Sequence, residues 1–171
     1  MKNVKLVVIG AGSSYTPELI EGVIKNHHQL PVSHIAFVDV EMGKKKMDII
    51  FQLTKRMLEK AGLAIEVSQT LNRGNALQGA DFVVTQLRVG GIDARIIDEK
   101  LPNGFIGQET NGAGGMFKAL RTIPVIIEIA NEMKEICPEA WLINFTNPAS
   151  MVTEAVLKYS NNNRVIGLCN G

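Results

Sequence analysis

The sequence predicts a doubly wound α/β fold, in which a mostly parallel sheet carries helices on both of its faces. Short apolar runs alternate with longer helical patterns along all 171 residues. The runs hold Val, Ile and Leu on consecutive positions, which is typical of strands buried on both faces of a parallel sheet. No internal repeat or low-complexity linker interrupts the alternation. Right-handed crossovers then determine the hand of the sheet.

Six short segments have the strand pattern: residues 4–9, 35–38, 64–67, 82–87, 141–145 and 165–168. Helical patterns lie between them, at residues 17–28, 43–61, 92–100, 117–136 and 149–159. In the second of these helices, Met47, Phe51 and Leu58 share one face at helical spacing. Pro17 in a first turn and Gly62 beyond a last turn mark helix ends.

The segment 88–115 is rich in glycine and polar residues. Apart from the short helix at 92–100, we expect it to form a long loop. Loops of that length in a compact domain are either functional or disordered. Charged side chains such as Arg88, Arg95 and Glu109, set among backbone-permissive glycines, favour a functional loop.

Composition excludes several classes of protein. With Lys+Arg 18 and Asp+Glu 17, the net charge of +1 argues against a nucleic-acid partner, which requires clustered positive charge. Two cysteines cannot form a disulfide framework, so we expect a reducing, cytoplasmic compartment. No apolar run reaches the roughly 18–20 residues of a membrane span, so no membrane partner is expected.

The first strand ends in a glycine turn that favours a bound dinucleotide. Gly10 permits the turn, and Gly12 lets the backbone approach a pyrophosphate closely. Ser13 and Ser14 follow at the start of a helix, where free N–H groups and the helix dipole favour an anion. Position 15 is Tyr rather than the third glycine of the full motif, so the context has to support the assignment.

The context is an acidic residue at the end of the second strand. Asp39 can accept hydrogen bonds from both ribose hydroxyls of NAD and would repel the 2′-phosphate of NADP. Together these features predict a Rossmann-type domain that binds NAD. In the alternative interpretation, Gly10 and Gly12 only turn a tight corner, and Asp39 caps the next helix.

Polar residues also follow the last two predicted strands. Asn147 can hold a substrate hydroxyl or carbonyl, or it can simply form an Asn-Pro turn that starts the next helix. Cys169 is either a small packing residue, the usual role of a free cysteine, or a thiolate ligand for a metal. Cys137, at a helix end, is expected to pack.

The motifs of the chain, taken together, resemble glycoside hydrolase family 4. They are GAGSSYTP at 10–17, RVGG at 88–91, GQETNG at 107–112, RTIP at 121–124, NFTNPA at 144–149 and CN at 169–170. They occur in the family's order from one end of the chain to the other. Within the family, the Cys-Asn pair is similar to that of the 6-phospho-β-glucosidases.

The resemblance implies a glycosidase that departs from the paired-carboxylate mechanism. In this family NAD takes hydride from C3 of the sugar, and a tyrosine base removes the C2 proton. A divalent metal, typically Mn²⁺, stabilises the resulting enolate. The leaving group at C1 is eliminated, water adds, and the hydride returns to C3. The implied substrate is a β-glucoside 6-phosphate or a phosphorylated disaccharide.

The resemblance also assigns roles to individual residues. Cys169 matches the metal-binding cysteine, and Asn170 the neighbouring position, an acid in α-specific members, which we expect to be catalytic. Glu109 matches the carboxylate that raises the basicity of the catalytic tyrosine. Arg95 and Asn147 match substrate contacts; a guanidinium suits a phosphate, and Arg88 is a further candidate for that role.

Family members are more than twice as long, and their metal-binding histidine and base tyrosine lie beyond the cysteine. We therefore expect residues 1–171 to be an N-terminal NAD-binding domain that lacks the C-terminal catalytic and oligomerisation part. The resemblance implies a dimeric or tetrameric parent. Two other interpretations remain: a lactate/malate-type NAD-dependent 2-hydroxyacid dehydrogenase, and a non-catalytic dinucleotide sensor.

Overall fold

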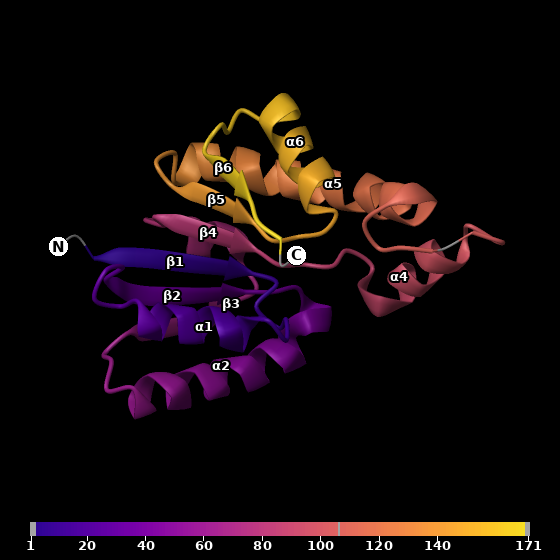
Figure 1. Cartoon of the computed structure of the whole chain (residues 1–171). Helices are drawn as coiled ribbons and strands as arrows, with labels where there is room; N and C mark the ends of the chain where they lie inside the picture. Colours follow the sequence, from indigo (N-terminus) through magenta and orange to yellow (C-terminus); the bar gives the residue numbers. More distant parts are fainter. Residues whose placement is uncertain (1–2, 106, 170–171) are drawn as a thin grey trace. The chain divides into compact units, whose positions relative to one another are not determined.

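The computed structural model describes residues 3–105 and 107–169. The chain forms two compact units, one up to Gln86 and the other from Leu87 onward. Strands and helices alternate in the first unit, whereas two consecutive helices open the second (Figure 1). Among the described residues, no helix is long and apolar enough to cross a membrane.

The first unit contains a four-stranded parallel sheet with the strand order β3-β2-β1-β4. Its strands are β1 (Val4–Ile9), β2 (Val32–Val38), β3 (Glu66–Thr70) and β4 (Phe82–Thr85). Val8 of the central strand β1 pairs with Phe37 on one side and Val84 on the other. Val8 and Phe37 are fully buried, as expected for a strand covered on both faces.

The strand predictions in this unit are confirmed, with shifted boundaries. The expected strand at 4–9 has its predicted ends. Strand β2 begins at Val32, three residues before the apolar run, and β3 continues to Thr70 through polar residues. Strand β3 pairs only with β2, so it lies at the edge of the unit's sheet, where polar side chains are tolerated.

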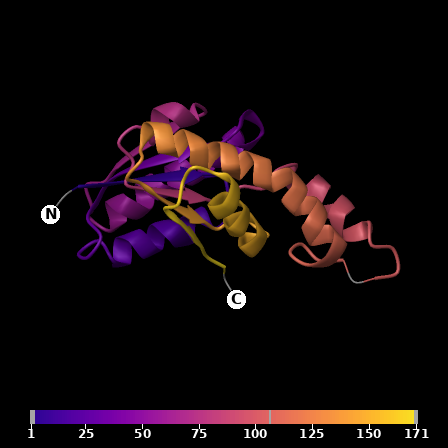
Figure 2. The ribbon, with the colours of Figure 1, turned by 90° about the horizontal axis from the view of Figure 1, so that it is seen from above.

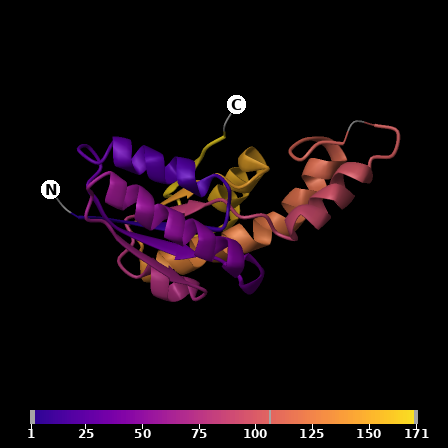
Figure 3. The same ribbon diagram turned by 90° about the horizontal axis from the view of Figure 1, so that it is seen from below.

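Two longer helices pack on one another and on the same face of this sheet (Figure 3). They are α1 (Thr16–Lys25) and α2 (Lys44–Lys60). Helix α2 buries Met47, Thr54 and Leu58, which lie on its predicted apolar face. Two short elements, η1 (Glu41–Gly43) and α3 (Arg73–Leu77), were not predicted, because neither has room for a helical repeat of apolar residues.

The second unit contains a parallel strand pair and three helices. The strands are β5 (Trp141–Asn144) and β6 (Val165–Gly167), and the helices are α4 (Gly91–Lys100), α5 (Gly112–Ile136) and α6 (Ala149–Tyr159). The long helix α5 lies beside both α4 and α6 (Figure 2). Its buried face includes Ile126, Ile129 and Met133, which are fully enclosed.

The expected long loop at 88–115 is therefore shorter than predicted. Helix α5 begins at Gly112 rather than at Phe117, so its first turn takes up the glycine-rich end of that segment. Gly114 and Gly115 are poor helix formers in isolation. Their lack of a side chain lets the backbone of the preceding segment, at Gln108 and Thr110, pack directly against them. Tertiary contact thus overrides the local propensity.

Candidate functional site

In the first unit, the glycine turn after β1 is tied to the end of β2. The backbone N–H groups of Gly10 and Ala11 both donate to the Val38 carbonyl, at 2.9 and 3.1 Å. Gly10 has a φ of +84°, a left-handed conformation that favours glycine. Helix α1 then starts at Thr16, so the predicted order of strand, turn and helix is confirmed.

The Asp39 carboxylate lies against this turn. Its Oδ2 accepts a hydrogen bond from the Gly12 N–H at 2.8 Å, and its Oδ1 accepts one from the Val40 N–H at 2.8 Å. A carboxylate offers about four acceptor positions, so each oxygen retains capacity for a hydroxyl donor. The structure thus orients a partly exposed carboxylate beside the glycine turn, which is compatible with the ribose of a dinucleotide.

Two glycines make room for this carboxylate. A Cβ atom on Gly43 would lie 2.0 Å from Asp39 Oδ1, and one on Gly12 would lie 3.0 Å from Oδ2. Gly43 was not recognised in the sequence as part of the site, because it lies outside the glycine motif. Ser13 and Ser14 belong to the same turn, with Ser14 exposed. The turn and Asp39 are therefore compatible with the predicted binding of a pyrophosphate and a ribose.

In the second unit, three cationic side chains surround Glu109. Arg88 Nη2 lies 3.2 Å from Oε1, and Arg95 Nη1 lies 3.3 Å from Oε2. Lys118 Nζ makes the closest contact, with Oε1. The cations come from the segment after β4, from α4 and from α5, so residues far apart in the sequence meet at one carboxylate. The structure brings together the three predicted residues Arg88, Arg95 and Glu109.

Lys118 is the member of this cluster that sequence reasoning missed. It belongs to the buried stripe of α5, four residues before Thr122 and eight before Ile126. A lysine within an apolar stripe at helical spacing is a detectable signal, since lysine is almost never fully buried unless it is paired.

The charges of the cluster shift its titration. Burial by itself raises the pKa of Glu109, but Lys118, Arg88 and Arg95 together hold this pKa below its usual value. Burial lowers the pKa of Lys118, and its contact with Glu109 opposes the shift without cancelling it. Glu109 is thus kept as a carboxylate in a net positive environment, which suits an anionic ligand.

Close backbone packing positions the segment that carries Glu109. A Cβ atom on Gly107 would lie 1.8 Å from the Glu99 carbonyl oxygen at the end of α4. On Gly115 it would lie 2.4 Å from the carbonyl carbon of Thr110. These glycines allow the segment to pack directly against α4 and the first turn of α5.

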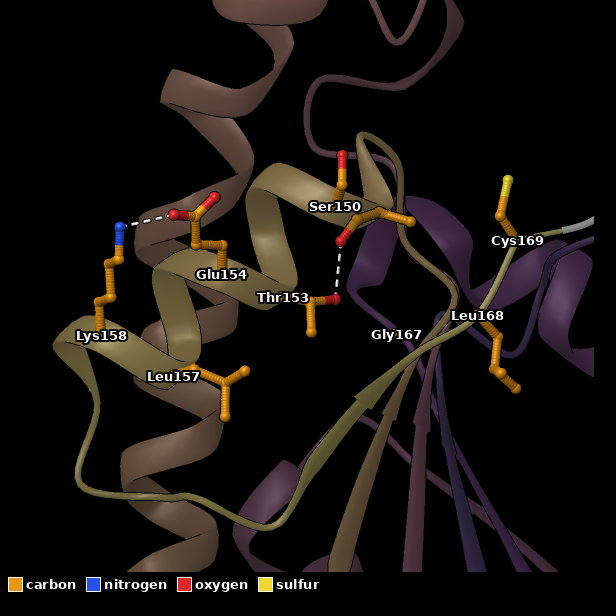
Figure 4. Close-up of a pocket in the computed structure, with 9 residues that line it drawn as sticks. Ser150, Thr153, Glu154, Leu157, Lys158, Gly167, Leu168 and Cys169 are labelled. Carbon is orange, nitrogen blue, oxygen red and sulfur yellow. Dashed lines mark hydrogen bonds and ion pairs between the residues drawn. The ribbon is translucent and has the colours of Figure 1, made fainter.

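Cys169, the predicted metal ligand, follows β6 and lines an open groove of about 580 Å³ between this strand and α6 (Figure 4). Leu157 on α6 and Leu168 also line this groove. Cys169 is exposed among the described residues, whereas Cys137 is buried as expected. Within residues 3–105 and 107–169, no three His, Cys, Asp or Glu side chains form a metal-binding group.

Asn147, the predicted substrate contact, lies between the end of β5 and the start of α6. Asn147 is partly buried and precedes Pro148, which is the N-cap of α6. The buried Asn144 organises this corner: its Oδ1 accepts from the Thr146 N–H at 3.1 Å and its Nδ2 donates to Thr153 Oγ1 at 3.2 Å. Asn170, predicted to be catalytic, lies outside the described residues.

The chain is similar in sequence to known proteins over nearly its whole length. It is 58% identical over 171 residues to the 6-phospho-β-glucosidase of Escherichia coli (strain K12) and 59% identical to a probable 6-phospho-β-glucosidase of Bacillus subtilis (strain 168). Both matches cover 99% of this chain but only 38% and 39% of the relatives.

The solved structure of the 6-phospho-β-glucosidase from Thermotoga maritima, with manganese, NAD⁺ and glucose-6-phosphate, is similar in fold. The TM-score is 0.89 at 35% identity, over 98% of this chain and 41% of that one. This agreement confirms the doubly wound, Rossmann-type fold class. The sequence model of the family 4 glycosyl hydrolases matches residues 5–171, and the chain therefore belongs to this family.

Proposed function

We propose that this chain is the NAD-binding part of a 6-phospho-β-glucosidase. The observation that carries the proposal is the 58% identity to an enzyme of that name over 99% of the chain. The chain spans about two fifths of the length of such relatives. The rest of the active site would therefore come from the part of the enzyme that this chain does not cover. Residues 1–171 would then be one domain of a longer enzyme.

The first unit would hold the cofactor. Gly10, Gly12, Ser13 and Ser14 would receive the pyrophosphate, and Asp39 would accept hydrogen bonds from the ribose hydroxyls. Asp39 supports this role because two backbone N–H groups already orient its carboxylate. NAD would supply a hydride acceptor that oxidises the sugar and later reduces it again.

The second unit would recognise the phosphorylated sugar. Arg95 and Arg88 present guanidinium groups with donors to spare beyond their contacts with Glu109, and a guanidinium matches the geometry of a phosphate. Asn147 would hydrogen-bond a sugar hydroxyl. Glu109 would assist the base that removes the sugar proton, and Asn170 would also contribute to catalysis.

Cys169 would provide one ligand to a divalent metal, with Mn²⁺ as the expected ion. Its exposed position permits this role, since a thiolate must be reachable to bind a metal. The described residues offer no complete ligand set around it, so the other ligands would come from the additional part of the enzyme. A cytoplasmic location and a homo-oligomeric parent belong to the same proposal.

The test is hydrolysis of a chromogenic β-glucoside 6-phosphate by the longer enzyme that contains this sequence. We expect turnover only with both NAD⁺ and Mn²⁺, and none with the unphosphorylated glucoside. The 171-residue chain should bind NAD in calorimetry without hydrolysing the substrate. Robust hydrolysis by this chain alone would contradict the domain assignment.

A second measurement separates the proposal from its rivals. A 2-hydroxyacid dehydrogenase would accumulate NADH from a 2-hydroxy acid, whereas a glycosidase that returns its hydride shows no net NADH. A dinucleotide sensor would bind NAD with an affinity that sugar phosphate and Mn²⁺ leave unchanged. Membership of the glycosyl hydrolase family favours the glycosidase over both.

A further inference from the structure

Lys118 differs from the two arginines that share its carboxylate partner. The side chains of Arg88 and Arg95 are 35% and 38% exposed, whereas that of Lys118 is only 4% exposed. Lys118 also lies on the buried face of α5, where its carbonyl accepts the Thr122 hydroxyl. The arginines can therefore move toward solvent and a ligand, while Lys118 is enclosed.

The contacts of the arginines are also the more easily exchanged ones. Arg88 and Arg95 reach Glu109 at 3.2 and 3.3 Å, and Arg95 divides its guanidinium between Glu109 and Glu99, its Nε lying 2.7 Å from the Glu99 carboxylate. An arginine has five donor hydrogens, so both can bind an incoming anion. A phosphate would compete with Glu109 for these two cations.

We propose that Lys118 is a positioning residue: it is the permanent partner that keeps the Glu109 carboxylate in place when Arg88 and Arg95 turn to the phosphate of the substrate. This inference rests on the proposed function, which supplies that phosphate. It assigns different tasks to three like charges, with the exposed pair binding substrate and the buried lysine holding the carboxylate.

The electrostatics of the cluster agree with this division. The groups that face Glu109 are Arg88 from the segment after β4, Arg95 from α4 and Lys118 from α5, with Glu99 beside Arg95. Lys118 makes the largest contribution that lowers the pKa of Glu109, ahead of either arginine. Once both arginines contact a phosphate, Lys118 remains to favour the ionised carboxylate.

The test is Lys118→Met in the longer enzyme, with Lys25→Met as the matched control. Lys25 is also a helical lysine paired with a glutamate, but it is exposed at the end of α1. We expect Lys118→Met to lower kcat by about tenfold or more and to move the acid limb of its pH profile to higher pH. NAD affinity should not change, and the control should alter none of these quantities.

A double-variant cycle distinguishes positioning from general stability. If Lys118 acts through Glu109, adding Lys118→Met to Glu109→Gln should cause no further loss of kcat. A further loss in the double variant, or an unshifted pH profile in Lys118→Met, would overturn the proposal. If Lys118→Met fails to fold, the double variant, which lacks both charges, is compared with Glu109→Gln: equal kcat values support the proposal, and a lower kcat in the double variant overturns it.

A readout without turnover separates this inference from the proposed function. The carboxyl carbon of Glu109 is followed by NMR in the 171-residue chain while pH is varied, with and without inorganic phosphate. We expect added phosphate to raise the titration midpoint of Glu109 more in Lys118→Met than in the wild type. If that result is found but the longer enzyme has no glucosidase activity, the proposed function alone is rejected. If the midpoints are equal but the longer enzyme is active, the role of Lys118 alone is rejected.

Discussion

The guanidinium of Arg121 on α5 holds the carboxylate of Asp98 on α4 through two hydrogen bonds, of 2.8 and 2.5 Å. Asp98 is only 4% exposed, and Arg121 also donates from Nε to the Val89 carbonyl at 3.4 Å. This pair therefore connects the elements that bring the three cations to Glu109.

Breaking this pair should destabilise the second unit. Asp98→Asn leaves the Arg121 cation without its bidentate partner, and because Arg121 is about a third exposed, we expect a loss of about 2–3 kcal/mol in the free energy of unfolding. Urea unfolding measures this loss. The control Glu154→Gln, in an exposed pair on α6, should leave the unfolding curve unchanged. Equal losses in the two variants would contradict the structural role of Asp98.

Gly43 should be required for cofactor binding, although it lies outside the glycine motif. In Gly43→Ala the new Cβ would displace the Asp39 carboxylate, whose Oδ1 lies 2.0 Å from that position, so we expect NAD affinity to fall about tenfold or more. Calorimetry of the 171-residue chain measures it.

The matched control for Gly43→Ala is Gly22→Ala. Gly22 is inside α1, where a Cβ meets nothing within 4 Å, so this change should preserve NAD binding and raise stability by about 0.5–1 kcal/mol. If both alanine variants bind NAD like the wild type, the proposed placement of the ribose at Asp39 is wrong.

Asp39 should determine the choice between NAD and NADP. In Asp39→Ala we expect NAD affinity to fall about tenfold, because the ribose loses charged acceptors. NADP affinity should change less or increase, since the repulsion of the 2′-phosphate is removed. Calorimetric titration with both nucleotides gives the ratio of affinities. Asp48→Asn, which alters a carboxylate that binds Gln69 on β3, is the control and should keep the wild-type ratio.

The ionisation of Glu109 should make the folded state less stable as the pH falls into the acid range. Its folded pKa is below the ordinary value of 4.5, so its ionisation stabilises the folded state fully above pH 4.5, and this contribution is lost as pH falls through the folded pKa. We expect the stability difference between wild type and Glu109→Gln to shrink steadily below pH 4.5. Urea unfolding at several pH values measures it; a difference that grows on acidification would show the opposite sign of shift.

The sheet and its principal helices were predictable because their signals are local. Consecutive apolar residues predicted β1, and a repeating apolar face predicted α2. The start of α5 was missed because Gly112, Gly114 and Gly115 disfavour a helix locally. Contact with the preceding segment explains why Gly114 and Gly115 are helical.

Local sequence patterns were enough to predict the parallel α/β fold, the glycine turn with its acidic partner Asp39 and, through the motifs, the glycosidase family. Tertiary structure alone decided that Lys118 contacts Glu109 and that Gly43 makes room for Asp39. The reason is physical. Hydrophobic periodicity depends only on residues that are close together in the sequence. The pairing of a buried charge depends instead on which side chains, distant in the sequence, the packed helices bring within hydrogen-bonding distance.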